Sequence, residues 1–105
     1  MSNDNGKIRA KAKDGGIAVR ALIRHPMETG SRKQPGTEEP IPRHYIQELL
    51  CEHNGDTVLR MDWGWGVSEN PYLAFHIQQG QPGDAVTIQW TDNMGAAGQL
   101  TTVAV

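Results

Sequence analysis

Short segments in which apolar and polar residues alternate cover most of this chain. Residues 7–13 place Ile8, Ala10 and Ala12 on one face and four cationic side chains on the other, and residues 17–24 alternate in the same way. Successive side chains of a β-strand point to opposite sides, so a period of two is typical of a strand with one buried face. Both segments are therefore predicted to be half-buried strands.

Further strand segments follow at residues 45–53, 56–63, 73–77, 86–90 and 100–105. Asp14-Gly15-Gly16 and Asn54-Gly55 mark hairpin turns, because these residues adopt positive φ at little cost. Residues 79–84 and 92–98 are also expected to be turns. No segment shows a sustained helical period, so the chain is expected to be all-β.

The whole chain, residues 1–105, is predicted to form one domain. About seven short strands separated by regular turns are typical of an immunoglobulin-like antiparallel β-sandwich, and a partly open barrel is the alternative. A length of 105 residues is close to the usual size of a single domain. Residues 1–6 are polar and are expected to form a flexible N-terminus.

Two segments, residues 26–42 and 64–71, interrupt the regular spacing of the strands. Pro26 lacks a backbone N–H and fixes its own φ, so the preceding strand is expected to stop at His25. Loops longer than about 12–15 residues usually have a function or are mobile. The loop and its return are therefore expected to supply partner-binding contacts through His25, Met27, Arg32 and His44. The alternative is a surface hairpin that Pro26 and Gly30 only shape.

The aromatic residues Trp63, Trp65 and Tyr72 flank or lie within the second irregular segment and are further candidates for partner binding. Aromatic side chains bury much area at little entropic cost, which suits a binding face. The alternative is that Trp63 belongs to the core and Trp65 covers one end of the sandwich. Trp90 lies within an alternating strand and is expected in the core.

Composition and charge exclude some classes of function. The formal net charge is −2, whereas a general binder of nucleic acid or of anionic membranes needs a basic surface. No run approaches the roughly 20 apolar residues that a membrane span needs. The polar first residues contain no apolar stretch typical of an export signal, which taken alone predicts a cytoplasmic protein.

The single cysteine, Cys51, cannot form a disulfide within the chain. It lies in an apolar-rich strand, so a packed thiol is expected, with an exposed thiol that pairs with a partner as the alternative. Cys51 and His53 share one strand face, and a cysteine-dependent enzyme using Cys51 is therefore an alternative hypothesis. Side chains two apart on a strand meet poorly, so no catalytic residue is predicted.

The spacing of the histidines gives no sign of a metal site. His25, His44, His53 and His76 contain no pair spaced as His-x-x-x-His, and zinc sites also favour cysteine ligands. No metal or cofactor site is therefore predicted. Acidic residues are ordinary at strand ends and turns, which is where the pattern places Asp62, Glu69, Asp84 and Asp92.

Five stretches of the chain, in order and at matching intervals, resemble the SoxZ subunit family of the sulfur-oxidation (Sox) carrier complex. They are residues 25–30, 41–48, 62–64, 67–73 and 90–95. Each stretch alone is weak, but five in order are specific, and the resemblance covers nearly the whole chain. Trp65 and Cys51 fall outside the family pattern, so no family role is assigned to them.

The resemblance implies a non-catalytic sandwich subunit that pairs with SoxY and has no cofactor of its own. In this family, SoxY holds the sulfur intermediates of thiosulfate oxidation on a cysteine in its flexible C-terminal segment, and other Sox enzymes bind the complex transiently. This chain ends in residues 101–105 without such a cysteine. The resemblance also implies a periplasmic location, because the twin-arginine signal of SoxY exports the folded pair. A generic β-sandwich interaction module is the remaining alternative.

Overall fold

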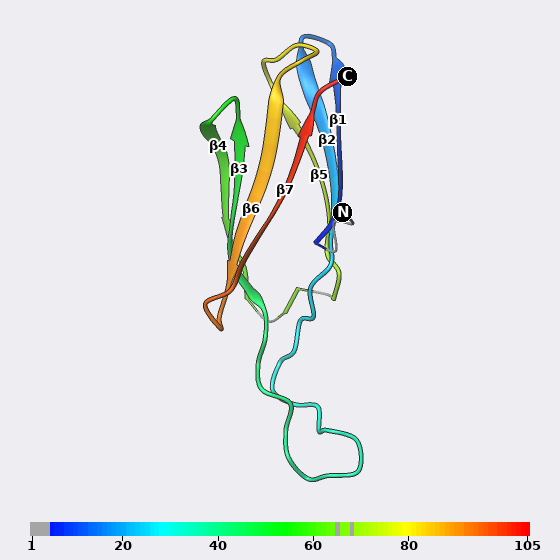
Figure 1. The fold of residues 1–105 in the computed structure, drawn as a ribbon, viewed down its shortest axis with the longest axis vertical. Coiled ribbons are helices and arrows are strands. Elements are labelled where there is room, and N and C mark those ends of the chain that lie inside the picture. Colours follow the sequence, from blue (N-terminus) through cyan, green and yellow to red (C-terminus); the bar gives the residue numbers. More distant parts are fainter. Residues whose placement is uncertain (1–4, 65, 68) are drawn as a thin grey trace.

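The computed structural model describes residues 5–64, 66–67 and 69–105, and these form seven strands and no helix (Figure 1). The strands are β1 (Gly6–Lys13), β2 (Gly16–Ile23), β3 (Ile46–His53), β4 (Asp56–Asp62), β5 (Tyr72–Ile77), β6 (Ala85–Asp92) and β7 (Ala97–Val103). They make two antiparallel sheets, ordered β1-β2-β5 and β4-β3-β6-β7. The predicted all-β sandwich is confirmed. Within the described residues there is no helix long and apolar enough to cross a membrane.

Two tight hairpin turns decide which strands pair. Asp14 and Gly15 connect β1 to β2 with φ angles of 54° and 80°, and Asn54 and Gly55 connect β3 to β4 with 51° and 90°. Positive φ at both central positions gives a turn whose twist matches that of antiparallel strands. Because the second turn makes β4 the hairpin partner of β3, β4 joins the four-stranded sheet. In the constant-type immunoglobulin arrangement, the fourth strand lies in the other sheet.

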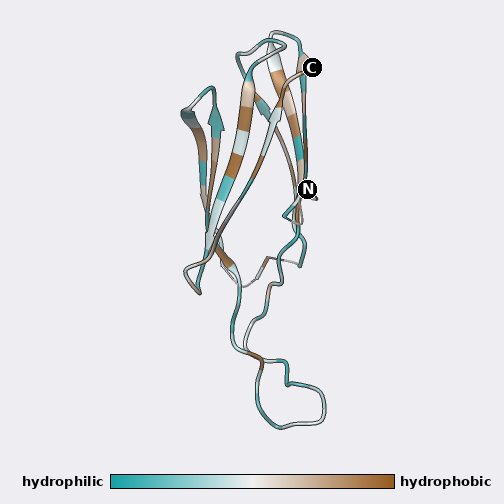
Figure 2. Cartoon of the chain, in the orientation of Figure 1, coloured by the Kyte–Doolittle hydropathy of each residue, from teal (hydrophilic) through white to brown (hydrophobic). Residues whose placement is uncertain are grey.

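The inner faces of the two sheets supply one hydrophobic core. Strand β2 buries every second residue, as its pattern predicts, and Cys51 and Trp90 also lie in the core, at 0% and 5% exposure. The largest fully buried side chains are Ile17, Ile23, Ile46, Leu49, Ile88, Leu100, Val19 and Val86. Hydrophobic residues are concentrated in the strands, whereas the long connection between β2 and β3 is mostly hydrophilic (Figure 2).

The first two strands have other bounds than predicted. β1 begins at Gly6, within the segment expected to be flexible, and residues 1–4 lie outside the described residues. Gly6 pairs with Ile23 and lies so near the Leu22 carbonyl that a Cβ would be 1.9 Å from its oxygen. β2 ends at Ile23 rather than at His25, because the N–H of His25 donates to the side-chain oxygen of Asn70 (3.0 Å) instead of to a strand.

The last strand is also shifted from its prediction. β7 begins at Ala97 and ends at Val103, whereas residues 100–105 were predicted, so the predicted turn over residues 92–98 is too long. The Asp92 carboxylate accepts hydrogen bonds from the backbone N–H groups of Met94 (3.0 Å) and Ala96 (2.9 Å), which closes the turn early. Val105 then continues beside β1, because its carbonyl accepts a hydrogen bond from the N–H of Ala12 (2.9 Å).

Residues 26–45, which we call the arm, extend beyond the end of the sandwich and lengthen the molecule to 54 Å (Figure 1). The two legs of the arm pair through backbone hydrogen bonds in both directions between Glu28 and His44, and through the Ile41 N–H and the Arg32 carbonyl (2.7 Å). Residues 31–40 are all exposed. The arm is therefore held by backbone and polar contacts rather than by a core of its own.

Gly98 provides a test of the core packing next to the β6–β7 turn. A Cβ at Gly98 would lie 2.6 Å from the indole ring of Trp90, so Gly98→Ala is expected to lower the free energy of unfolding by about 1–3 kcal/mol. The matched control is Gly64→Ala, where a Cβ would meet no atom of the described residues within 4 Å and φ is not positive. Urea denaturation measures both variants, and equal stability of the two would contradict this account of the packing.

Candidate functional site

Three side chains meet where the arm leaves the sandwich. His25 follows β2, His44 precedes β3, and Asp92 is the last residue of β6. Both histidines direct Nε2 at the same carboxylate oxygen, Oδ2 of Asp92, at 3.1 Å from His25 and 2.8 Å from His44. The two imidazole rings lie edge to face, with centroids 4.6 Å apart and an interplanar angle of 68°. We call this group the root cluster.

The two oxygens of the Asp92 carboxylate contact different groups. Its Oδ1 accepts the N–H groups of Met94 and Ala96, while Oδ2 faces the histidines. Burial by itself would raise the pKa of Asp92, but the contacts of its carboxylate with His25 and His44 and its hydrogen bonds from the two backbone N–H groups outweigh burial and lower the pKa to about 2. Asp92 is therefore an anion held in a fixed orientation at neutral pH.

The tautomer of His25 is fixed by its other ring nitrogen. Nδ1 lies 2.5 Å from the carbonyl oxygen of Pro26. A carbonyl oxygen only accepts hydrogen bonds, so the proton of a neutral His25 must sit on Nδ1. The remaining nitrogen, Nε2, then points a lone pair at the Asp92 carboxylate.

Two asparagines attach both legs of the arm to the sandwich. Asn70 accepts the N–H of His25 with its side chain, and its own N–H donates to the His25 carbonyl (3.1 Å). Asn93 accepts the N–H of Tyr45 (2.8 Å) and donates its side-chain amide to the Arg43 carbonyl (2.8 Å). The arm therefore starts and returns through defined hydrogen bonds, which hold His25 and His44 close together.

Of the residues predicted to bind a partner, the structure brings only His25 and His44 into the root cluster. Met27 and Trp63 are partly buried against the core, in agreement with the alternative considered for Trp63. Arg32 lies further along the arm, where its side chain forms an ion pair with Glu28. Tyr72 is 60% exposed at the start of β5. Trp65 lies outside the described residues.

Asp92 belongs to the root cluster but is not among the predicted site residues, because acidic residues are ordinary in turns. Strand β6 contains a signal that could have found it, because Val86, Ile88, Trp90 and Asp92 follow one another with a period of two. The first three are core residues, so the alternation places a carboxylate on the buried face. The proximity of His25 and His44 to it needed the tertiary structure.

The thiol of Cys51 is buried between the two sheets. Its exposed fraction is 0%, and burial is the main cause that raises its pKa to about 11, with the Glu52 charge adding to it. His53 pairs with Asp84 instead, with Nε2 2.8 Å from the carboxylate oxygen. A protonated, inaccessible thiol is a poor nucleophile, so the geometry counts against the cysteine-dependent enzyme.

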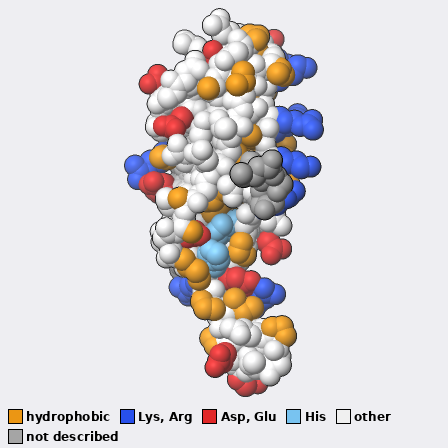
Figure 3. Space-filling view, in the orientation of Figure 1, with side chains coloured by type: hydrophobic (Ala, Val, Ile, Leu, Met, Phe, Trp, Pro, Cys, Tyr) orange, Lys and Arg blue, Asp and Glu red, His pale blue; other side chains and the backbone are white. Residues whose placement is uncertain are grey.

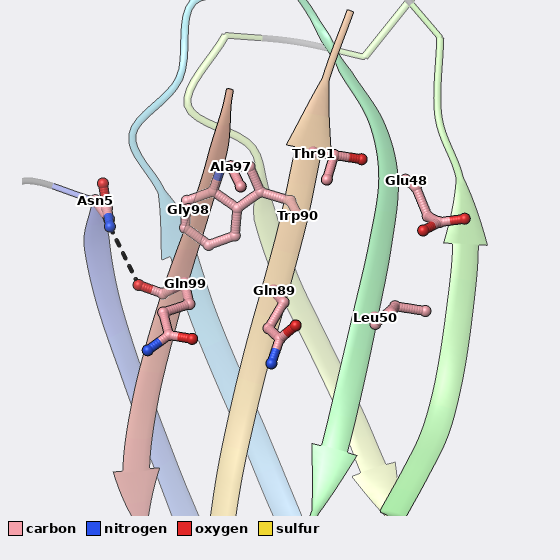
Figure 4. Close-up of a pocket in the computed structure, with 9 residues that line it drawn as sticks. All are labelled: Asn5, Glu48, Leu50, Gln89, Trp90, Thr91, Ala97, Gly98 and Gln99. Carbon is pink, nitrogen blue, oxygen red and sulfur yellow. Dashed lines mark hydrogen bonds between the residues drawn. The ribbon is translucent and has the colours of Figure 1, made fainter. Parts of the chain in front are cut away.

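A groove and a basic stripe lie on the outer faces of the two sheets. A groove of about 390 Å³ crosses the outer face of the four-stranded sheet near its arm end, where Gln89 lies between Leu50 and Gln99 on neighbouring strands (Figure 4). Its one acidic lining residue, Glu48, pairs with Arg60. The cationic residues of β1 make a separate basic stripe along the other sheet, visible as the blue edge in Figure 3.

Comparison with models of protein families identifies a family that this chain matches. The family model described as "Sulphur oxidation protein SoxZ" matches residues 7–103, which include almost all of the seven strands and the whole arm. No curated protein matches the chain.

The reactivity of Cys51 follows from its burial. A rise of the pKa from 9.0 to about 11 lowers the thiolate fraction near neutral pH by about 100-fold, and exclusion of the reagent slows reaction further. Iodoacetamide at pH 8 is therefore expected to label the native chain at least about 100-fold more slowly than the urea-unfolded chain. Mass spectrometry over time measures both rates, and native labelling as fast as unfolded labelling would revive the enzyme hypothesis.

Proposed function

Because the chain belongs to the SoxZ family of sulphur oxidation proteins, we propose that it is the non-catalytic subunit of a sulfur carrier and pairs with a SoxY chain. Membership of this family implies a role in sulfur oxidation. The observation that carries the proposal is the family match over residues 7–103, which spans both sheets, the root cluster and the arm. The seven-strand sandwich supports it, since the sequence resemblance implied this fold.

The sulfur intermediates of thiosulfate oxidation would be held by the cysteine of SoxY. The burial of Cys51 supports this division, because a covalent sulfur adduct needs an accessible thiolate. On this proposal the chain needs no cofactor for the carrying step, and it helps to present the SoxY-bound sulfur to Sox enzymes. The pair would act in the periplasm, exported through the signal of SoxY.

We place the contact with Sox enzymes on the arm. Residues 31–40 are exposed, and the Glu28–Arg32 and Lys33–Glu38 pairs give the arm a polar surface without a net excess of either sign. The arm is attached at both legs by Asn70 and Asn93, so it is held out from the sandwich rather than hanging free. A polar, projecting segment suits a transient contact that must release its partner.

Pairing with SoxY is the first test of this function. The chain co-expressed with the SoxY encoded beside it is expected to co-purify as a one-to-one complex, measured by light scattering after size exclusion. Cys51→Ser or Cys51→Ala should leave thiosulfate oxidation by the reconstituted Sox system nearly unchanged, whereas loss of the SoxY cysteine should abolish it. A chain that ignores SoxY, or lost turnover with a folded Cys51 variant, would contradict the proposal.

Truncation of the arm tests its role separately. Replacing residues 29–43 with Asn-Gly is expected to close a two-residue hairpin directly on the hydrogen-bonded pair Glu28 and His44, leaving the root cluster in place. SoxY pairing and melting temperature should persist, while the KM of a Sox enzyme for the carrier rises.

A milder change and its control refine the arm test. Arg32→Ala should give a smaller rise in KM, and Arg60→Ala, which removes another exposed arginine–glutamate pair, should give none. Unaltered enzyme kinetics of the truncated chain would exclude the arm as the contact. Loss of SoxY pairing would assign it to the subunit interface.

A further inference from the structure

The root cluster lacks a positive charge at its centre when its histidines are neutral. The proton of a neutral His25 is on Nδ1, where the Pro26 carbonyl accepts it, so Nε2 and the Asp92 oxygen face each other with lone pairs at 3.1 Å. His44 directs Nε2 at the same oxygen. A proton or a metal ion must therefore lie between Nε2 of His25 and the Asp92 oxygen, and a metal ion at this point could also be ligated by Nε2 of His44.

We propose that His25, His44 and Asp92 bind one divalent transition-metal ion, with Zn²⁺ as the best-fitting ion. The ligands would be Nε2 of each histidine and Oδ2 of the aspartate, and one ligand atom from each of the three residues lies within 4.8 Å of the other two. Imidazole and carboxylate are ligands that Zn²⁺ accepts in proteins. This inference goes beyond the proposed function and does not depend on it.

The separations of the ligand atoms are close to those of a metal site. Bonds of about 2.0–2.1 Å at tetrahedral angles put neighbouring ligand atoms roughly 3.3 Å apart. The observed distances from Oδ2 are 3.1 Å to His25 and 2.8 Å to His44. An expansion of a few tenths of an ångström would admit the ion, and the half-buried His44, whose side chain is 29% exposed, can make part of this shift.

The groups around the three ligands have the arrangement that metal sites use. Metal-binding histidines commonly donate the N–H of the second ring nitrogen to a carbonyl, as His25 does to Pro26, and ligating carboxylates are themselves hydrogen-bonded. Oδ1 of Asp92 accepts two backbone N–H groups, which leaves Oδ2 for an ion. The ring of His25 and the carboxylate are therefore oriented before any ion binds.

The position of the cluster determines how an ion would enter and which segments it would hold together. His25 and Asp92 are 8% and 5% exposed, so the ion would reach them past His44 at the surface, where histidine side chains are visible in Figure 3. Three protein ligands leave the fourth tetrahedral position for water or an anionic ligand. Because the ligands come from the residue just before the arm, from its returning leg and from β6, the bound ion would fix the base of the arm to the sandwich.

Zinc titration of the untagged full chain, stripped with a chelator, tests the proposal by calorimetry. One Zn²⁺ per chain is expected to bind, and the melting temperature should rise with Zn²⁺ and fall again with EDTA. Co²⁺ in the same site should give the visible absorption of a tetrahedral ion, and Zn²⁺ should displace it. These readouts do not involve SoxY or enzyme activity, so their failure leaves the proposed function standing.

The variants distinguish the root cluster from other histidines. Asp92→Asn keeps an oxygen for the backbone N–H groups but removes the anionic ligand, and His44→Ala removes the most exposed ligand. Each should weaken Zn²⁺ binding by more than the roughly 10–100-fold that loss of an outer partner costs. The matched control is His53→Ala, since His53 also touches a carboxylate at 2.8 Å but has no third ligand near it in the described residues.

Two results would overturn the proposal. One is a wild-type chain that binds Zn²⁺ no more tightly than His44→Ala, and the other is a His53→Ala variant that loses the binding. In the first case, the root cluster is held together by hydrogen bonds alone, without a metal ion. If Asp92→Asn fails to fold, His44→Ala decides the question, because its backbone pairing with Glu28 does not need the imidazole.

Discussion

The contacts of the Asp92 carboxylate hold together the end of the sandwich from which the arm extends. One oxygen closes the β6–β7 turn through two backbone N–H groups, and the other faces the histidines at the start and the return of the arm. A buried anion is stable only when its hydrogen-bonding capacity is filled, and here both oxygens are engaged. The same charge therefore sets the length of a turn, the position of β7 and the point at which the arm leaves the sandwich.

The sandwich and the arm are stabilised by different forces. The sandwich buries a continuous hydrophobic core, and hairpin turns with positive φ fix its register. The arm has exposed residues over its outer half and exposed ion pairs, which contribute little to stability. Its geometry therefore depends on its attachment, through Asn70, Asn93 and the root cluster. A rigid base under a polar segment is the arrangement expected of a surface that partners contact repeatedly.

The thiol of Cys51 is enclosed by the hydrophobic core. A thiol in an apolar interior has a raised pKa and no access to reagents, so it packs as a small hydrophobic residue. In a protein of a sulfur-oxidation family, this cysteine packs as a core residue, and its thiol is shielded from reagents.

Local residue patterns are sufficient to predict the strands and their buried faces. Alternation identified Ile17, Val19 and Ile23 as core residues, and Asp14-Gly15 and Asn54-Gly55 located the hairpins, because side-chain direction and positive φ are local properties. The predicted boundaries of β2 and β7 were wrong, because the side chains of Asn70 and Asp92 accept hydrogen bonds from backbone N–H groups at these strand ends.

The site depends on contacts between segments that are distant in the sequence. His25, His44 and Asp92 are separated in sequence by 19 to 67 residues, and no spacing rule connects ligands from three segments. The spacing of histidines therefore predicted no metal site, although the root cluster has the geometry for one. Local alternation can place Asp92 on a buried face, but the choice of its neighbours depends on how two sheets pack and where the arm returns. That choice is made by long-range packing, which a local pattern does not contain.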